Sequence, residues 1–107
     1  MRTKRGPSWD TTVGIREQAE WIEHAQFADK LVKDGRILLG GPIEDPDPDV
    51  VALVAMELPE ASSVHEIFAD DPWVRSGVLS VKDIRPWRIW LRPRARDIDT
   101  ADLGDEK

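Results

Sequence analysis

Two segments of the chain carry the three- and four-residue apolar spacing of an amphipathic helix. The first runs over residues 17–34, with acids early and lysines late, as the helix dipole favours. The second runs over residues 59–71, where Ser63 and Glu66 have the spacing of a capping box. Pro72 is expected to end this second helix, because proline disfavours the helical conformation in the residue before it.

Three apolar runs predict strands, over residues 36–42, 50–58 and 77–91. In the last run the apolar alternation slips near Pro86, which indicates a bulge or a bend. Residues 1–16 are expected to be irregular after a short first strand. The order (β)αββαβ predicts an α+β, ferredoxin-like fold: a four-stranded antiparallel sheet with two helices on one face.

The strand predicted over residues 50–58 is apolar on both of its alternating faces. Two helices cover only one face of a sheet, so the other face would expose an apolar surface too large for a soluble monomer. A second copy that packs sheet to sheet is the simplest cover. We therefore expect a homodimer, with the cleft at the dimer interface as the natural pocket.

The length of 107 residues and 40% apolar content predict a single domain, over residues 1–92, with a polar tail over residues 93–107. A net charge of −6 argues against nucleic-acid binding, and the arginines of residues 92–96 are interpreted as part of a solvated tail. The absence of cysteine excludes disulfides and thiolate chemistry. No signal peptide and no membrane-spanning run are recognised, so we expect a cytoplasmic protein without a membrane partner.

His24 lies at the spacing of the buried stripe of the first helix. It is either a histidine at the edge of the core or a general acid/base, and the second role requires a carboxylate that fixes its tautomer. Asp71, at the end of the second helix, is the candidate. Asp70 and Asp71 also fit a solvated helix end, but an acid there opposes the helix dipole unless it has a partner.

The other candidate site residues are interpreted as structural. His65 is interpreted as a surface residue, and no histidine and acid pair has metal-ligand spacing, so no metal is expected. The acids of residues 44–49 alternate with proline and lack the glycine of a calcium loop. Gly41 and Pro42 belong to a tight turn or a close backbone approach rather than a phosphate loop.

Two stretches, HAQFADKLVKDGRILLGGP and ADDPWVRSGVLSVKDIRPW, resemble the YCII-related (YciI-like) family over roughly residues 17–91. The resemblance implies a ferredoxin-like protomer that dimerises into an α+β barrel. It also implies a His-Asp pair in a cleft near the dimer interface, which falls on His24 and Asp71; Asp70 does not match the motif. The family opens with an apolar first strand, whereas MRTKRGPSW carries only its polar end, so we expect a first strand that is either short or truncated at the recorded start.

We therefore expect a cofactor-free lyase or hydrolase that acts on a small organic acid. His24 would be the general acid/base and Asp71 would orient it. Two alternatives stay open: a non-catalytic dimeric module that binds a ligand or a protein, and a cofactorless oxygenase of the same fold class. The residues expected to line the substrate are Trp21, Gly41, Pro42, Trp73 and Trp87.

Overall fold

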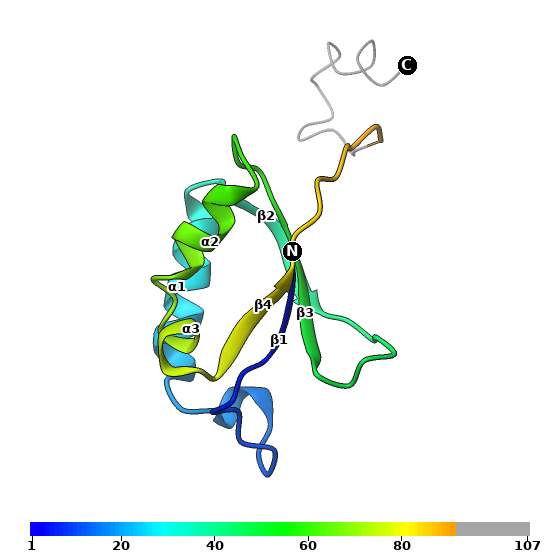
Figure 1. Ribbon diagram of the computed structural model, residues 1–107. Helices are drawn as coiled ribbons and strands as arrows, with labels where there is room; N and C mark the ends of the chain where they lie inside the picture. Colours follow the sequence, from blue (N-terminus) through cyan, green and yellow to red (C-terminus); the bar gives the residue numbers. More distant parts are fainter. Residues whose placement is uncertain (92–107) are drawn as a thin grey trace.

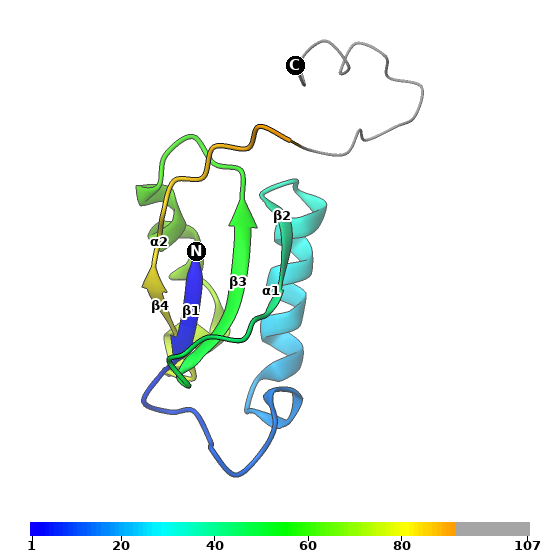
Figure 2. The same ribbon diagram turned by 90° about the vertical axis from the view of Figure 1, so that its right-hand side faces the viewer.

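The computed structural model describes residues 1–91, which form a four-stranded antiparallel sheet with helices on one face (Figures 1 and 2). The strand order is β2-β3-β1-β4, as in a ferredoxin-like fold. No helix of the described residues is long and apolar enough to cross a membrane. The elements are β1 (Arg2–Arg5), η1 (Ile15–Glu17), α1 (Trp21–Lys33), β2 (Ile37–Pro42), β3 (Val50–Met56), α2 (Ser62–Phe68), α3 (Pro72–Ser76) and β4 (Leu79–Asp83).

The first helix begins four residues later than its apolar spacing predicts. A short 3₁₀ turn, η1, precedes it, and Glu20 then adopts a left-handed backbone conformation with φ of 62° at the N-cap of α1. This conformation is uncommon for a residue with a side chain. Gly35, with φ of 77°, follows the helix as its sequence predicts.

The second predicted helix is wrong in its start and in its end. The N-cap of α2 is Ala61, and no side chain caps it, so the predicted capping box of Ser63 and Glu66 does not form. The helix stops at Phe68. Pro72 does not terminate a helix but begins α3, because proline at the first helical position lacks only an N–H that would have no partner there.

The first strand is short but central, since β1 pairs with β3 on one side and with β4 on the other. The last strand ends at Asp83, so the prediction of a strand through residue 91 is wrong. Asp83 pairs with Arg2, the first residue of β1, and residues 84–91 have no partner strand within the described part of the chain. Pro86 also lacks the N–H that a ladder needs.

Two apolar clusters join the helices to the sheet. One centres on Leu31 and Phe68 and lies between α1, α2 and the sheet. The other centres on Trp73 and Leu79 and lies beneath α3. The first cluster holds α1 and α2 in place, and the second fixes the short helix α3 against α1.

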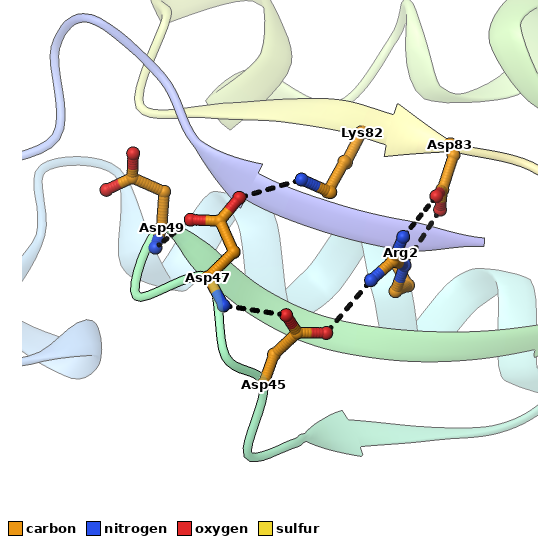
Figure 3. A network of polar contacts seen from close by, with 6 residues as sticks. All are labelled: Arg2, Asp45, Asp47, Asp49, Lys82 and Asp83. Carbon is orange, nitrogen blue, oxygen red and sulfur yellow. Dashed lines mark hydrogen bonds and ion pairs between the residues drawn. The ribbon is translucent and has the colours of Figure 1, made fainter.

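The sheet face away from the helices, which we call the open face, carries charge as well as apolar side chains (Figure 3). Arg2 binds Asp83 and, at 2.9 Å, Asp45, while Lys82 binds Asp47 at 2.7 Å. These hydrogen bonds hold the pKa of both Asp83 and Asp47 below the ordinary aspartate value.

The open face is therefore not uniformly apolar, which differs from the expectation drawn from β3. Its charges come from β1, β4 and the loop of residues 43–49, outside the strand whose pattern predicted an apolar face. Exposed apolar side chains remain in the half of the face formed by β2 and β3, where Leu39 is 61% exposed and Leu53 is 37% exposed.

Candidate functional site

A histidine and an aspartate that are 47 residues apart in the chain form a direct contact between α1 and the start of α3. The Nδ1 atom of His24 lies 2.9 Å from each carboxylate oxygen of Asp71. The Asp71 side chain is fully buried, and the side chain of His24 is 16% exposed. Among the residues that hydrogen-bond the Asp71 carboxylate in the described part of the chain, only His24 has a partly exposed side chain.

Asp71 is fixed by the backbone around it. It is the N-cap of α3, and its Oδ1 accepts a hydrogen bond of 2.9 Å from the backbone N–H of Trp73. A carboxylate at a helix N-terminus is favoured by the helix dipole, in contrast to the helix C-terminus expected from the sequence. The capping hydrogen bond therefore satisfies part of the buried carboxylate, and His24 is its second hydrogen-bond partner.

Trp73 packs directly against the ring of His24. Its indole ring stacks on the imidazole of His24, with 3.8 Å between the ring centroids and 7° between the planes. The indole Nε1–H donates a hydrogen bond of 2.6 Å to the carbonyl oxygen of Ala19, just before α1. Trp21 contacts both rings at a tilt, and Trp9 packs edge-on against Trp73.

The hydrogen bonds determine which nitrogen of His24 is available for chemistry. A carboxylate only accepts hydrogen bonds, so Nδ1 must carry the proton that it shares with Asp71. In the neutral imidazole the free lone pair is then on Nε2, the nitrogen that does not face Asp71. This arrangement can accept a proton at Nε2 and hold the resulting cation next to a carboxylate.

The structure brings together four of the seven residues expected at the site and leaves the other three apart from them. Trp21 and Trp73 belong to the cluster around His24 and Asp71. Gly41 and Pro42 lie in β2, opposite Leu53 and Ala52 of β3, and Trp87 lies after β4. The roles of these last three residues in binding a substrate stay predictions.

Neither of two cavities in the described part of the protein is lined by His24 or Asp71. The larger, about 830 Å³, lies where β1 begins, between β3, the start of α2 and the residues after β4, and Trp87 is in its wall. The smaller, about 440 Å³, lies beside β4 and includes His65. The His24 and Asp71 pair thus lies outside both of these cavities, and the side chain of His24 is partly exposed.

Two residues that support the site, Gln18 and Trp9, were not recognised in the sequence. Gln18 is buried, and its side-chain amide accepts a hydrogen bond from the backbone N–H of Asp10 at 2.9 Å and donates one to the backbone carbonyl of Asp10 at 2.7 Å. It thereby closes the loop that carries Trp9 and leads into α1. A glutamine in a polar stretch gives no signal of burial, whereas the tryptophan at position 9, in a segment rich in Gly and Pro, was a signal that some of this segment is packed.

No group of three histidine, aspartate or glutamate side chains in residues 1–91 is placed to hold a metal ion. His65 is exposed on α2, and Asp70 is exposed and pairs with Arg75 at 3.1 Å.

The fold and the pair define a class: a small α+β protein in which a buried aspartate orients a histidine at the junction of two helices. The sequence model of the YCII-related domain matches residues 11–88, which is most of the chain. The chain belongs to the YCII-related domain family, as its two motifs predicted. Comparisons with curated proteins and with solved structures gave no match.

Proposed function

We propose that the protein is a small-molecule enzyme in which His24 is the general acid/base. The observation that carries this proposal is the contact of His24 Nδ1 with both oxygens of the fully buried Asp71. The carboxylate would fix the tautomer of the neutral imidazole and stabilise the imidazolium that forms when Nε2 takes a proton. Proton abstraction followed by elimination, or activation of water for hydrolysis, fits such a pair without a cofactor.

The substrate would approach Nε2 at the surface of the protomer, where the side chain of His24 is partly exposed. We propose a homodimer in which the open faces pack together, with a cleft near the interface as the family resemblance implies. Exposed Leu39 and Leu53 support the dimer, because apolar side chains on a sheet face are stabilised by a cover. A small organic acid is the substrate class that the family resemblance suggests.

A second function is favoured by one observation: the cavities of about 830 and 440 Å³ are both lined by residues other than His24. A non-catalytic dimeric module could bind a ligand or a protein in such a cavity. The pair of His24 and Asp71 would then serve only to hold α1 against α3.

Incubation of purified protein with a cell metabolite extract, followed by mass spectrometry, separates the two functions. The proteins compared are wild type, His24→Gln and His65→Gln, the last being a matched control at the exposed histidine of α2. An enzyme that uses His24 converts a metabolite with wild type and with His65→Gln, and His24→Gln slows the conversion by about a hundredfold or more. Conversion that survives His24→Gln would exclude the proposed role. A metabolite that is retained unchanged by all three proteins would favour the binding module.

A further inference from the structure

Gln18 is a buried polar side chain that the reaction proposed for His24 does not use. It follows η1 and is 3% exposed, although residues 10–14 of the same loop are exposed. A buried amide is unfavourable unless its polar atoms are hydrogen-bonded. The hydrogen bonds of Gln18 therefore explain why it is buried in a loop that is otherwise open to solvent.

The side-chain amide of Gln18 pairs with the backbone of Asp10 as a neighbouring peptide group would. Its Oε1 accepts from the N–H of Asp10 at 2.9 Å, and its Nε2 donates to the carbonyl oxygen of Asp10 at 2.7 Å. The Nε2 also donates longer bonds of 3.3 and 3.4 Å to the carbonyl oxygens of Val13 and Gly14. An amide offers both an acceptor and donors for these contacts, whereas a carboxylate of the same shape has no proton to donate to the three carbonyl groups.

Three consecutive residues, 18–20, connect this loop to the candidate site. The first of them binds the loop through its side chain. The carbonyl oxygen of Ala19 accepts the indole N–H of Trp73 at 2.6 Å. The carbonyl oxygen of Glu20 accepts the backbone N–H of His24 at 3.0 Å. The position of the loop is therefore coupled both to the tryptophan that stacks on the imidazole and to the first turn of α1.

The indole of Trp73 depends on the carbonyl group of Ala19. The side chain of Trp73 is fully buried, and in residues 1–91 its N–H has no other acceptor. A buried donor that loses its acceptor is unfavourable, so the indole is expected to change its position when Ala19 moves. The imidazole of His24 lies on this indole with 3.8 Å between centroids, and its orientation changes with that of the indole.

We propose that Gln18 is a positioning residue for His24. By binding Asp10, Gln18 fixes the carbonyl group of Ala19. That carbonyl group holds Trp73, and the ring of Trp73 orients the imidazole of His24. Gln18 thus acts through its neighbours and not on the substrate. Its importance for catalysis rests on the proposed function of His24, whereas its effect on the imidazole can be measured without any substrate.

The substitution Gln18→Glu keeps the shape of the side chain and removes its donor. In folded protein, judged by circular dichroism, the ring-current shift of the His24 ring protons should be lost, with exposed His65 as the internal reference. Gln26→Glu makes the same chemical change at an exposed position of α1, and the shift should persist there. A merely structural role for Gln18 predicts lower stability with unchanged His24 shifts, and that result in Gln18→Glu would overturn the proposal.

Hydrogen exchange in the wild-type protein tests the same coupling even if Gln18→Glu does not fold. The backbone N–H of Asp10 and the indole N–H of Trp73 should become exposed in one local opening. Their protection factors should therefore agree and should fall together as denaturant is added. Protection of the Trp73 indole that exceeds that of Asp10 by about tenfold or more would show that the indole is held without the loop, and would contradict the proposal.

Kinetics then test whether the orientation matters for the reaction. With a metabolite that the wild-type protein converts through His24, Gln18→Glu should lower kcat about tenfold or more, because a misplaced catalytic group reacts slowly. KM should change little, since no contact with the substrate is lost. An altered His24 shift with a wild-type kcat would remove Gln18 from the positioning of the reaction. Conversion that does not depend on His24 would contradict the proposed function, and the ring-current comparison would still decide whether Gln18 orients the imidazole.

Discussion

The imidazole ring of His24 lies flat on the indole ring of Trp73, with 3.8 Å between centroids and 7° between planes. The same tryptophan donates its backbone N–H to Asp71 and its indole N–H to Ala19. Trp73 thus orients the ring of His24, hydrogen-bonds Asp71 and connects both residues to the start of α1. The local sequence Asp-Pro-Trp places Trp73 for these contacts, because Asp71 caps the helix that Pro72 begins.

Replacement of Trp73 by leucine should remove the fixed orientation of the His24 ring in a protein that still folds. The change removes the ring stack and the bond to Ala19, and the loss of a fully buried indole should cost about 2–4 kcal/mol of unfolding free energy. By NMR, the ring-current shift of the His24 ring protons should disappear. Trp9→Leu removes a tryptophan that contacts Trp73 edge-on, and the shift should persist there. An unchanged shift in Trp73→Leu would contradict the stacked geometry.

Replacement of Asp71 by asparagine should reverse the tautomer of His24. The amide oxygen can still accept from the backbone N–H of Trp73, but the amide NH₂ then points at Nδ1. Nδ1 becomes the acceptor, and the proton moves to Nε2. The ¹⁵N chemical shifts of His24 report the exchange, with exposed His65 as the internal reference.

If His24 is a general base, turnover by Asp71→Asn should fall about a hundredfold or more, because the lone pair then faces away from the substrate. Asp70→Asn is the matched control at the neighbouring exposed acid, and it should keep both the tautomer and the activity. Wild-type nitrogen shifts in Asp71→Asn would rule out the assigned hydrogen bond.

Much of the fold follows from local sequence patterns. The prediction of the last strand is wrong because strand formation depends on contacts with residues that are distant in the chain. Periodicity placed α1, β2 and β3, and the order of the elements predicted the antiparallel sheet. Residues 84–91 were predicted to continue the last strand because apolar alternation resumes after a slip near Pro86, but a strand also needs a partner. Alternation alone cannot supply that information.

The candidate pair could be selected from the sequence only in part. The helical stripe placed His24 near the core, and the family motif selected Asp71 over Asp70. The role of Asp71 as an N-cap was missed because Pro72 was interpreted as the end of a helix rather than the beginning of one. The stack on Trp73 and the buried amide of Gln18 depend on packing between α1, α3 and the loop before them, which no local spacing encodes.

Replacement of Glu20 by glycine should stabilise the protein. Glu20 has a left-handed backbone with φ of 62° and makes no side-chain capping bond, so its side chain adds strain without a compensating contact. Glycine adopts this conformation freely, and the unfolding free energy should rise by about 1 kcal/mol. Gln26→Gly, at an exposed position inside α1, should instead lower it by about 1 kcal/mol. Denaturant titrations followed by circular dichroism measure both; equal losses in the two variants would contradict the strain at Glu20.

The ion pairs of the open face predict how stability depends on acid. Hydrogen bonds from Arg2 and Lys82 lower the pKa of Asp83 and of Asp47 in the folded protein. A lowered folded-state pKa means that the contribution is complete above the pKa of the unfolded aspartate and is lost as the pH falls through the folded pKa. The loss should therefore occur below about pH 4.

Asp83→Asn tests this assignment through the melting temperature between pH 2.5 and pH 7. The variant should melt a few degrees below wild type at neutral pH, since exposed pairs contribute modestly, and the difference should narrow as the pH falls below about 4 and the wild-type carboxyl is protonated. Asp49→Asn changes an acid of the adjoining loop that has no ion pair within residues 1–91, and it should follow wild type throughout. A gap between wild type and Asp83→Asn that is as wide at pH 2.5 as at pH 7 would mean that the carboxylate charge is not what stabilises this corner of the sheet.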